Sequence, residues 1–165
     1  LYVADNMNFT HAIQIDADGQ HDLAAVTDFL DQARHNPQAL VCGYPVYDQT
    51  VPLARLWGRE LTNFWVHVNT RSKALKDAMC GFRVYPIAQT LPVLPSVRTR
   101  RMDFDPDIAV RLLWAGVPVI NRPVRVTYPK DGISHFRGFS DNMRISRLHA
   151  EHFCTMLLRR MGLAK

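Results

Sequence analysis

Two carboxylates stand two residues apart where an apolar segment of the sequence ends. Residues 11–16 alternate as a buried strand does and stop at Asp16, and Asp18 follows before Gly19 allows a sharp turn. Alternate side chains of an extended segment point the same way, so Asp16 and Asp18 can converge on one cation. Such oxygen ligands suit Mg²⁺ or Mn²⁺, which commonly takes substrate phosphates as well. A plain polar turn is the alternative.

Strands and helices alternate along the rest of the chain. Apolar spacing predicts four helices, at 23–35, 53–68, 105–115 and 140–161, and Asp22 could cap the first of them. Short apolar runs predict further strands at 39–43, 81–85, 117–120 and 124–127, with an irregular loop at 44–52. This alternation predicts an α/β sheet covered by helices on both faces. Ligands of such sheets bind beyond the carboxyl ends of the strands, which is where the two aspartates stand.

The composition excludes several classes of protein. With 165 residues, of which 47% are hydrophobic and 21% charged, the chain is neither disordered nor collagen-like. The net charge of +5 favours anionic partners such as phosphates or lipid head groups. No apolar run approaches the roughly 18–20 residues that span a bilayer. Three widely separated cysteines show no metal-binding spacing.

Several motifs together resemble a known family. Residues 15–21, Ile-Asp-Ala-Asp-Gly-Gln-His, resemble the metal-binding motif of family 2 glycosyltransferases. Residues 77–85 resemble its Asp-x-x-(Ser/Cys)-Gly-Phe-Arg signature, residues 104–123 its acidic helix start and following strands, and residues 128–137 its terminal Gly-x-Ser loop. The resemblance extends from Ala12 to about Arg147. The most similar branch contains the polyprenyl-phosphate sugar synthases, such as dolichyl-phosphate mannose synthase.

The resemblance implies a fold and a domain organisation. The expected fold is the GT-A type, a three-layer α/β/α arrangement found in nucleotide-diphospho-sugar transferases. Residues 1–165 would form a single partial catalytic domain, the C-terminal portion of the fold, without the N-terminal nucleotide-binding strands. Within it we expect a metal turn at 13–22, an acceptor half at 39–137 and a closing helix at 140–161.

The resemblance also implies an activity. An inverting glycosyltransferase would move a sugar, as hexosyltransferases do, from a nucleotide-diphosphate donor to a lipid-linked, polyprenyl-phosphate or glycan acceptor. Asp16 and Asp18 would hold the Mg²⁺ or Mn²⁺, and Gln20 matches a position where some relatives supply a further metal contact. We expect the partial domain to be inactive by itself. A divalent-metal phosphohydrolase or nuclease is the alternative enzyme class.

Three further aspartates are candidates for the catalytic base. Asp77 matches an aspartate proposed in the family to accept the acceptor proton. Asp105 and Asp107 are its rivals, because other branches place the base at an acidic pair in this region. A helix cap or a salt bridge is the alternative role for Asp77. If the acceptor is a phosphate, which is already anionic, Asp77 would only orient it.

Basic and hydroxyl side chains are candidates for substrate binding. Arg59 and Arg83 could clamp phosphate oxygens with their bidentate guanidinium groups, and a buried ion pair is the alternative. Ser134, His135 and Arg137 lie in a loop that could close over a phosphate, and a plain surface loop is the alternative.

One position departs from the family pattern. Tyr44 and Pro45 follow Gly43, where the polyprenyl-phosphate synthases carry an arginine that helps to bind phosphate. A hydroxyl acceptor on a lipid, glycan or secondary metabolite therefore competes with a lipid phosphate.

We expect a cytoplasmic protein that contacts the inner face of the membrane peripherally, in the synthesis of cell-envelope glycans or lipids. The basis is the cluster of basic residues in the linker before 105 and in the last helix, namely Arg98, Arg100, Arg101, Arg144, Arg147, Arg159 and Arg160. The alternative is a closing helix with an ordinary solvated face. No nucleic-acid partner is expected, because no binding motif for one is present.

Overall fold

A four-stranded sheet organises the chain. The computed structural model describes residues 1–47, 51, 53–127 and 138–163. The strands are β1 (His11–Gln14), β2 (Leu40–Tyr47), β3 (Arg83–Pro86) and β4 (Val119–Val126), in the order β1-β3-β2-β4. β3 is antiparallel to both of its neighbours, and β2 is parallel to β4. The carboxyl ends of β1, β2 and β4 therefore lie at one edge.

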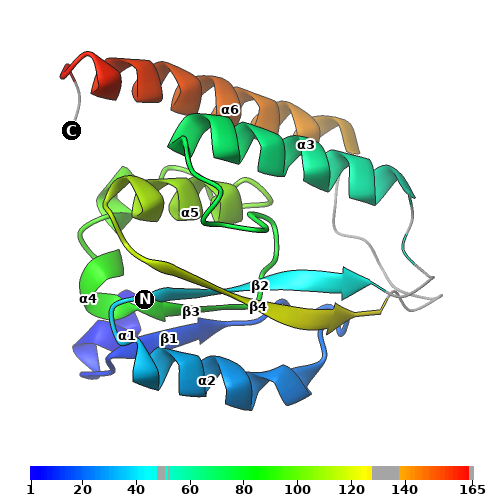
Figure 1. Ribbon diagram of the computed structural model, residues 1–165, viewed down its shortest axis with the longest axis vertical. Coiled ribbons are helices and arrows are strands. Elements are labelled where there is room, and N and C mark those ends of the chain that lie inside the picture. The colour runs from blue at the N-terminus through cyan, green and yellow to red at the C-terminus, as the bar shows by residue number, and fades with distance from the viewer. Residues whose placement is uncertain (48–50, 52, 128–137, 164–165) are drawn as a thin grey trace.

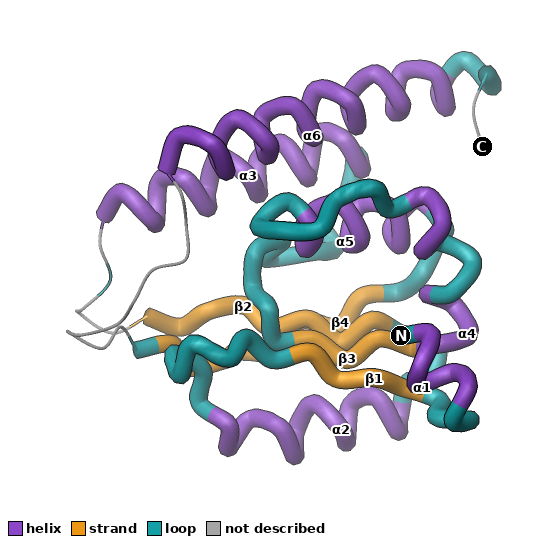
Figure 2. The backbone as a smooth tube through the Cα atoms, turned by 180° about the vertical axis from the view of Figure 1, so that it is seen from behind, coloured by secondary structure: helices purple, strands orange, loops and turns teal. Residues whose placement is uncertain are grey.

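Helices cover both faces of the sheet. They are α1 (Tyr2–Asn6), α2 (Val26–His35), α3 (Leu53–Thr70), α4 (Ile87–Thr90), α5 (Phe104–Trp114) and α6 (Gly138–Arg160), with short 3₁₀ turns η1 (Leu23–Ala25) and η2 (Leu94–Ser96). α2 lies on one face, and α5 lies on the other beneath α3 and α6 (Figures 1 and 2). This arrangement confirms the expected three-layer α/β/α architecture of a GT-A-like fold. Among the described residues, none of the helices combines the length and apolar character that a membrane crossing requires.

Two apolar cores explain why the strands read as continuous apolar runs. Val41 and Val84 face α2 and pack with Phe29, whereas their neighbours Leu40 and Tyr85 belong to the cluster formed with α5. Successive strand residues thus enter opposite cores. Because both faces of the sheet are buried, the strand sequence does not alternate between apolar and polar residues.

The strands β2 and β4 are longer than the sequence predicts. β2 continues to Tyr47 through the expected loop, and β4 is one strand where two were expected, because eight residue pairs join them from Leu40–Val119 to Tyr47–Val126. Two prolines suggested breaks, but each removes only one donor. Pro123 lies on an edge strand, and Pro45 lies beyond the two β2 residues that pair with β3. Long-range pairing therefore overrides the local signal.

The last helix docks through buried polar groups. Nε2 of His152 lies 2.9 Å from Oδ1 of Asp107 on α5, and Asn69 on α3 donates to the backbone carbonyl of His149 at 3.3 Å. Among the described residues, neither ring nitrogen of His149 has a hydrogen-bond partner. Burial, together with the neighbouring His152, lowers the pKa of His149 to about 4. His149 is thus held neutral between Trp65 and the rest of the interface.

Acidification should weaken this docking. In the unfolded chain His149 takes up a proton near its ordinary pKa of 6.5, whereas in the folded protein it does so only near its pKa of about 4. The free energy of unfolding therefore falls as the pH falls from the first value to the second. Asp107 has a lowered pKa, so the stability that it contributes is lost only when the pH falls below its ordinary value of 3.8. We expect Tm to fall between about pH 7 and pH 5, and His149→Leu to flatten that dependence. Thermal unfolding measures both. The exposed His35→Leu is the control, and an unchanged pH slope in His149→Leu contradicts the assignment.

Candidate active site

The turn that carries the two aspartates is tied to the end of β4. The backbone N–H of Thr127 donates to the carbonyl of Gln20 at 3.0 Å, and that of Asp22 donates to Arg125 at 3.1 Å. The Asp22 carboxylate also accepts from the N–H of Ala24 at 2.9 Å and so begins η1 as predicted. Hydrogen bonds on both sides therefore fix the turn at the carboxyl edge of the sheet.

Asp16 lies directly over Gly81. A Cβ atom added to Gly81 would overlap the Asp16 carboxylate, so the missing side chain makes room for it. The Asp16 side chain is 44% exposed, and Nε2 of His21 lies 3.8 Å from its Oδ2. The positive φ of 72° at Gly19 turns the chain back, and exposed Asp18 accepts the N–H of Gln20 at 3.1 Å.

Asp16 and Asp18 are the residues of this turn that could hold a hard divalent cation. Both carboxylates are exposed, and Gln20 is half-buried in the same turn. Within the described part of the chain, no group of three or more His, Cys, Asp or Glu side chains could hold a metal. Two carboxylates suit a Mg²⁺ or Mn²⁺ whose other ligands are substrate oxygens and water.

A loop at residues 77–81 brings a buried carboxylate next to this turn. Oδ1 of Asp77 accepts hydrogen bonds from Nη1 of Arg59 at 2.6 Å and from the N–H of Met79 at 2.9 Å. One helical turn beyond Arg59, Asn63 accepts the N–H of Ala78 at 2.9 Å. Burial disfavours the Arg59 charge, but the Asp77 carboxylate more than offsets this, so the pKa of Arg59 lies above its ordinary value. α3 therefore braces the loop.

Arg83 holds the loop from the opposite side. Its guanidinium is completely buried and donates to the carbonyls of Cys80 at 2.9 Å, Ala78 at 2.7 Å and Asp105 at 2.8 Å. Every nitrogen of the group is thus engaged by backbone. The structure gives Arg83 a positioning role in place of the expected phosphate contact.

Asp105 lies at the start of α5 beside the same loop. Its Oδ1 accepts from Nε2 of Gln14 at 3.0 Å, and the hydroxyl of Tyr85 donates to Gln14 at 3.0 Å. Burial raises the pKa of Asp105, and the charges of Asp16 and Asp77 act in the same direction. Arg83 and the Gln14 hydrogen bond oppose the shift. The charges of Asp16 and Asp77 therefore both act on Asp105.

Asp107 has a different environment from Asp105. It is completely buried and accepts hydrogen bonds from Thr99, Arg111 and His152. These contacts join it to α6, so the structure separates it from the other carboxylates and we do not retain it as a base. Ser134, His135 and Arg137 lie outside the described residues.

Some members of the site are visible only in the structure. Gln14 and Tyr85 were expected only as parts of strands, yet they connect to Asp105 by hydrogen bonds. The signal for Gln14 is a polar residue within an otherwise apolar strand. Tyr85 gives no such signal, because aromatic residues are common in buried strands.

Comparison with known proteins supports the glycosyltransferase resemblance. No family model matches the chain. A dolichyl-phosphate beta-glucosyltransferase of Dictyostelium discoideum is 22% identical over 145 residues, which cover 83% of this chain and 44% of that protein. The chain thus spans less than half of the relative's length. This similarity supports the superfamily and not the mannose synthase branch.

Removal of the Arg59 charge should destabilise the loop at 77–81. Arg59→Gln leaves the buried Asp77 carboxylate without its cation, and breaking a buried pair costs about 3 kcal/mol. Arg34→Gln breaks an exposed helical pair and should cost less than about 1 kcal/mol. Urea unfolding measures both free energies. The double variant Arg59→Gln/Asp77→Asn should recover part of the loss, and equal costs for the two single variants would refute the buried-pair argument.

Proposed function

We propose that this chain carries the metal-binding and acceptor-side part of an inverting glycosyltransferase. The reaction moves a sugar from a nucleotide-diphosphate donor to a lipid-linked or glycan acceptor. The observation that carries the proposal is that the Asp16 carboxylate lies over Gly81 and that the charges of Asp16 and Asp77 both act on Asp105. The Dictyostelium relative supports the class of reaction.

The exposed Asp-x-Asp turn is the donor side of the proposed site. Asp16 and Asp18 would hold Mg²⁺ or Mn²⁺, with Gln20 as a candidate additional contact from the same turn. A bound cation would neutralise the donor diphosphate and assist its departure. The hydrogen bonds that the Gln20 carbonyl accepts from Thr127 and that the N–H of Asp22 donates to the Arg125 carbonyl would keep the turn in place while the donor binds.

Asp77 is the better placed of the two remaining candidates for the base. Oδ1 is occupied by Arg59 and Met79, whereas Oδ2 has no hydrogen bond within the described part of the chain. Oδ2 can therefore accept the proton of an acceptor hydroxyl. Asp105 stays as the second candidate, because burial raises its pKa toward values useful in proton transfer.

The acceptor side combines aromatic and basic groups. Nζ of Lys76 lies 4.4 Å from the centre of the Tyr44 ring, and Cζ of Arg59 lies 5.8 Å from that of Tyr47. Lys76 thus brings a cation to the position where the family pattern has an arginine. A lipid phosphate could bind to such cations, and the relative's name supports this acceptor over an uncharged one.

Loss of one metal-turn carboxylate should abolish turnover. In the intact protein, Asp18→Asn removes a charge from the cation site, so metal-dependent transfer from a nucleotide sugar should fall at least about a hundredfold. Asp22→Asn is the matched control, because asparagine caps a helix as well as aspartate does. Transfer of radiolabelled sugar to a lipid acceptor is the measurement. Near-normal transfer in Asp18→Asn, or phosphate release without transfer in the unmodified protein, would sink the proposal.

A side chain at residue 81 should weaken the same site without unfolding the protein. Gly81→Ala pushes the flexible Asp16 carboxylate aside, so Mn²⁺ affinity should fall by about tenfold while Tm changes little. Gly58→Ala is the control, because a Cβ atom there meets nothing within 4 Å. Calorimetric titration with Mn²⁺ measures both. Unchanged affinity in Gly81→Ala would show that Asp16 is not a ligand.

A further inference from the structure

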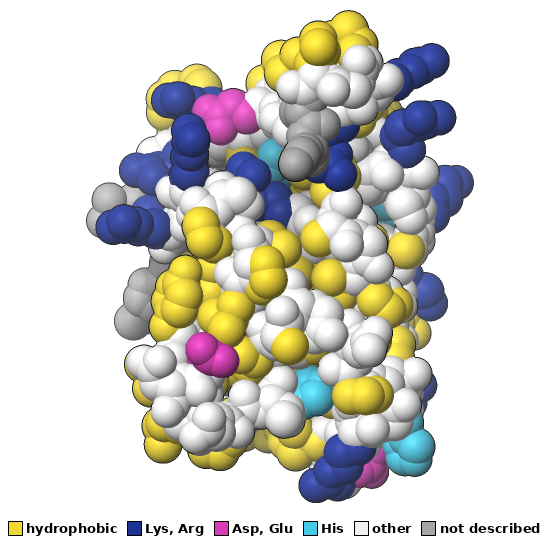
Figure 3. Space-filling model, turned by 90° about the vertical axis from the view of Figure 1, so that its left-hand side faces the viewer, with side chains coloured by type: hydrophobic (Ala, Val, Ile, Leu, Met, Phe, Trp, Pro, Cys, Tyr) yellow, Lys and Arg dark blue, Asp and Glu magenta, His cyan; other side chains and the backbone are white. Residues whose placement is uncertain are grey.

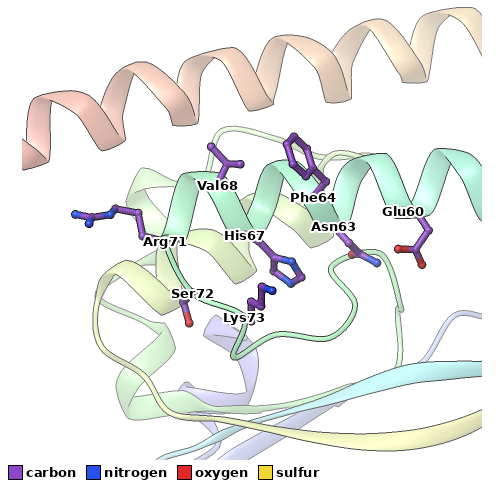
Figure 4. Close-up of a pocket in the computed structure, with 8 residues that line it drawn as sticks. All are labelled: Glu60, Asn63, Phe64, His67, Val68, Arg71, Ser72 and Lys73. Atoms are coloured by element: carbon purple, nitrogen blue, oxygen red, sulfur yellow. The ribbon is translucent and has the colours of Figure 1, made fainter.

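α3 and the segment that follows it border an open pocket. Its volume of about 570 Å³ is within the range of about 300–1,000 Å³ that small-molecule sites usually have. The wall on α3 includes residues that recur every three or four positions and so share one helical face, namely Glu60, Asn63, Phe64, His67 and Arg71. The segment after the helix contributes Lys73 (Figure 4). We call this site the α3 pocket.

Hydrogen bonds hold the segment after α3 in place. Nε2 of His67 lies 2.8 Å from the carbonyl oxygen of Leu75. Asn121 on β4 donates to the carbonyl of Ala74 at 2.7 Å and accepts the N–H of Lys76 at 2.9 Å. The segment is thus fixed both to the helix and to the sheet. A ligand would therefore meet a pocket that is already formed, and binding would not have to order it.

Polar side chains of the α3 pocket are available to a ligand. Among the described residues, Glu60, Arg71 and Lys73 form no salt bridge, and all three are exposed. Asn63 and His67 point from α3 toward the following segment, and Lys73 points back toward His67 (Figure 4). The pocket therefore combines cations with groups that can donate or accept hydrogen bonds.

Arg71 adopts a backbone conformation that glycine adopts more easily. α3 ends at Thr70, and the φ of Arg71 is 53°. The residue after a helix in this left-handed conformation is most often glycine, because a Cβ atom is unfavourable there. Arginine therefore carries a backbone cost that glycine would avoid. A need for a cation at the end of the α3 pocket explains why this residue stands there.

The surroundings of the α3 pocket favour an anion. Figure 3 shows the end of the molecule toward which α3 and α6 run, and basic side chains predominate over acidic ones on it. An excess of positive charge on one face attracts anionic ligands. Arg71 and Lys73 would meet a phosphate or carboxylate group at this end of the pocket.

The rest of the α3 pocket suits a ligand that carries hydroxyl groups. The Glu60 carboxylate can accept hydrogen bonds from hydroxyls, and the Asn63 amide can donate to them. Phe64 is 56% exposed and offers a ring against which the C–H face of a sugar can pack. A phosphate ion by itself would leave most of the volume empty, and an apolar ligand would leave the polar groups unpaired.

We propose that the α3 pocket binds a saccharide that carries a phosphate or carboxylate group. The anionic group lies at Arg71 and Lys73, and the hydroxyl groups lie along α3 toward Asn63 and Glu60. The proposal goes beyond sugar transfer and does not rest on it.

The α3 pocket adjoins the candidate active site. Asn63, which lines the pocket, accepts the N–H of Ala78 in the loop that carries Asp77. Glu60 directly follows Arg59, which binds Asp77. A saccharide bound in the pocket would therefore lie next to the loop that carries the candidate base.

Equilibrium dialysis of the intact protein with radiolabelled sugars tests the proposal. EDTA is present, so that a metal bound at the Asp-x-Asp turn does not contribute. Glucose 6-phosphate or glucuronic acid should bind, and glucose and inorganic phosphate should each bind at least about tenfold more weakly. Arg71→Gly should lower the affinity at least about fivefold while Tm stays the same or rises, because glycine relieves the backbone. Lys73→Gln should also weaken binding. Arg100→Gln changes another exposed arginine of a loop and is the matched control.

The outcomes separate an acidic saccharide from a bare anion. Affinity for inorganic phosphate as high as that for the acidic sugars would overturn the proposal, and so would the absence of binding by both sugars. Equal affinity of Arg71→Gly and Arg100→Gln would also refute it, since the loss must be specific to the pocket. Binding of glucose 6-phosphate alone assigns a phosphate as the anionic group, and binding of glucuronic acid alone assigns a carboxylate.

Discussion

The buried guanidinium of Arg83 is the interaction on which the candidate site depends. It joins three carbonyls from two segments, the loop at 77–81 and the start of α5, and it anchors them to β3. A buried charge is costly unless its donors are engaged, so this geometry specifies one conformation of the loop. That conformation puts Gly81 beneath Asp16 and directs Asp77 toward Arg59. The positions of the loop at 77–81 and of the start of α5 thus depend on one cation that meets no solvent.

Clustered carboxylates oppose folding, and the structure offsets this cost locally. Asp16 and Asp77 disfavour the charge on Asp105, while Arg83 and Gln14 favour it. Arg59 supplies the counter-charge of Asp77. Among the described residues, no lysine or arginine forms a salt bridge with Asp16, and Nε2 of His21 lies 3.8 Å from its carboxylate. The exposed end of the cluster is therefore the part that gains most from a divalent cation, whereas the buried end is already balanced by protein groups.

The layer of α3 and α6 serves the site on one side and solvent on the other. Its inner face is unusually polar, since Asn63, Asn69 and His149 are buried there beside apolar residues. Asn63 braces the loop of Asp77, and Asn69 binds the backbone of α6. Its outer face is unusually apolar. The buried amides of the inner side thus order a polar loop and the last helix.

The sequence by itself determined the local features of this protein. The alternation of strands and helices, the cap at Asp22 and the Asp-x-Asp turn after β1 follow from nearest-neighbour geometry and from the period of apolar residues. Only the tertiary structure decided which of the later charged residues share a site. Asp105 and Asp107 are separated by a single residue, yet one faces Gln14 and the other His152. The reason is that their partners come from elements far away in the chain, as do the strand pairs that carry β2 and β4 through their prolines.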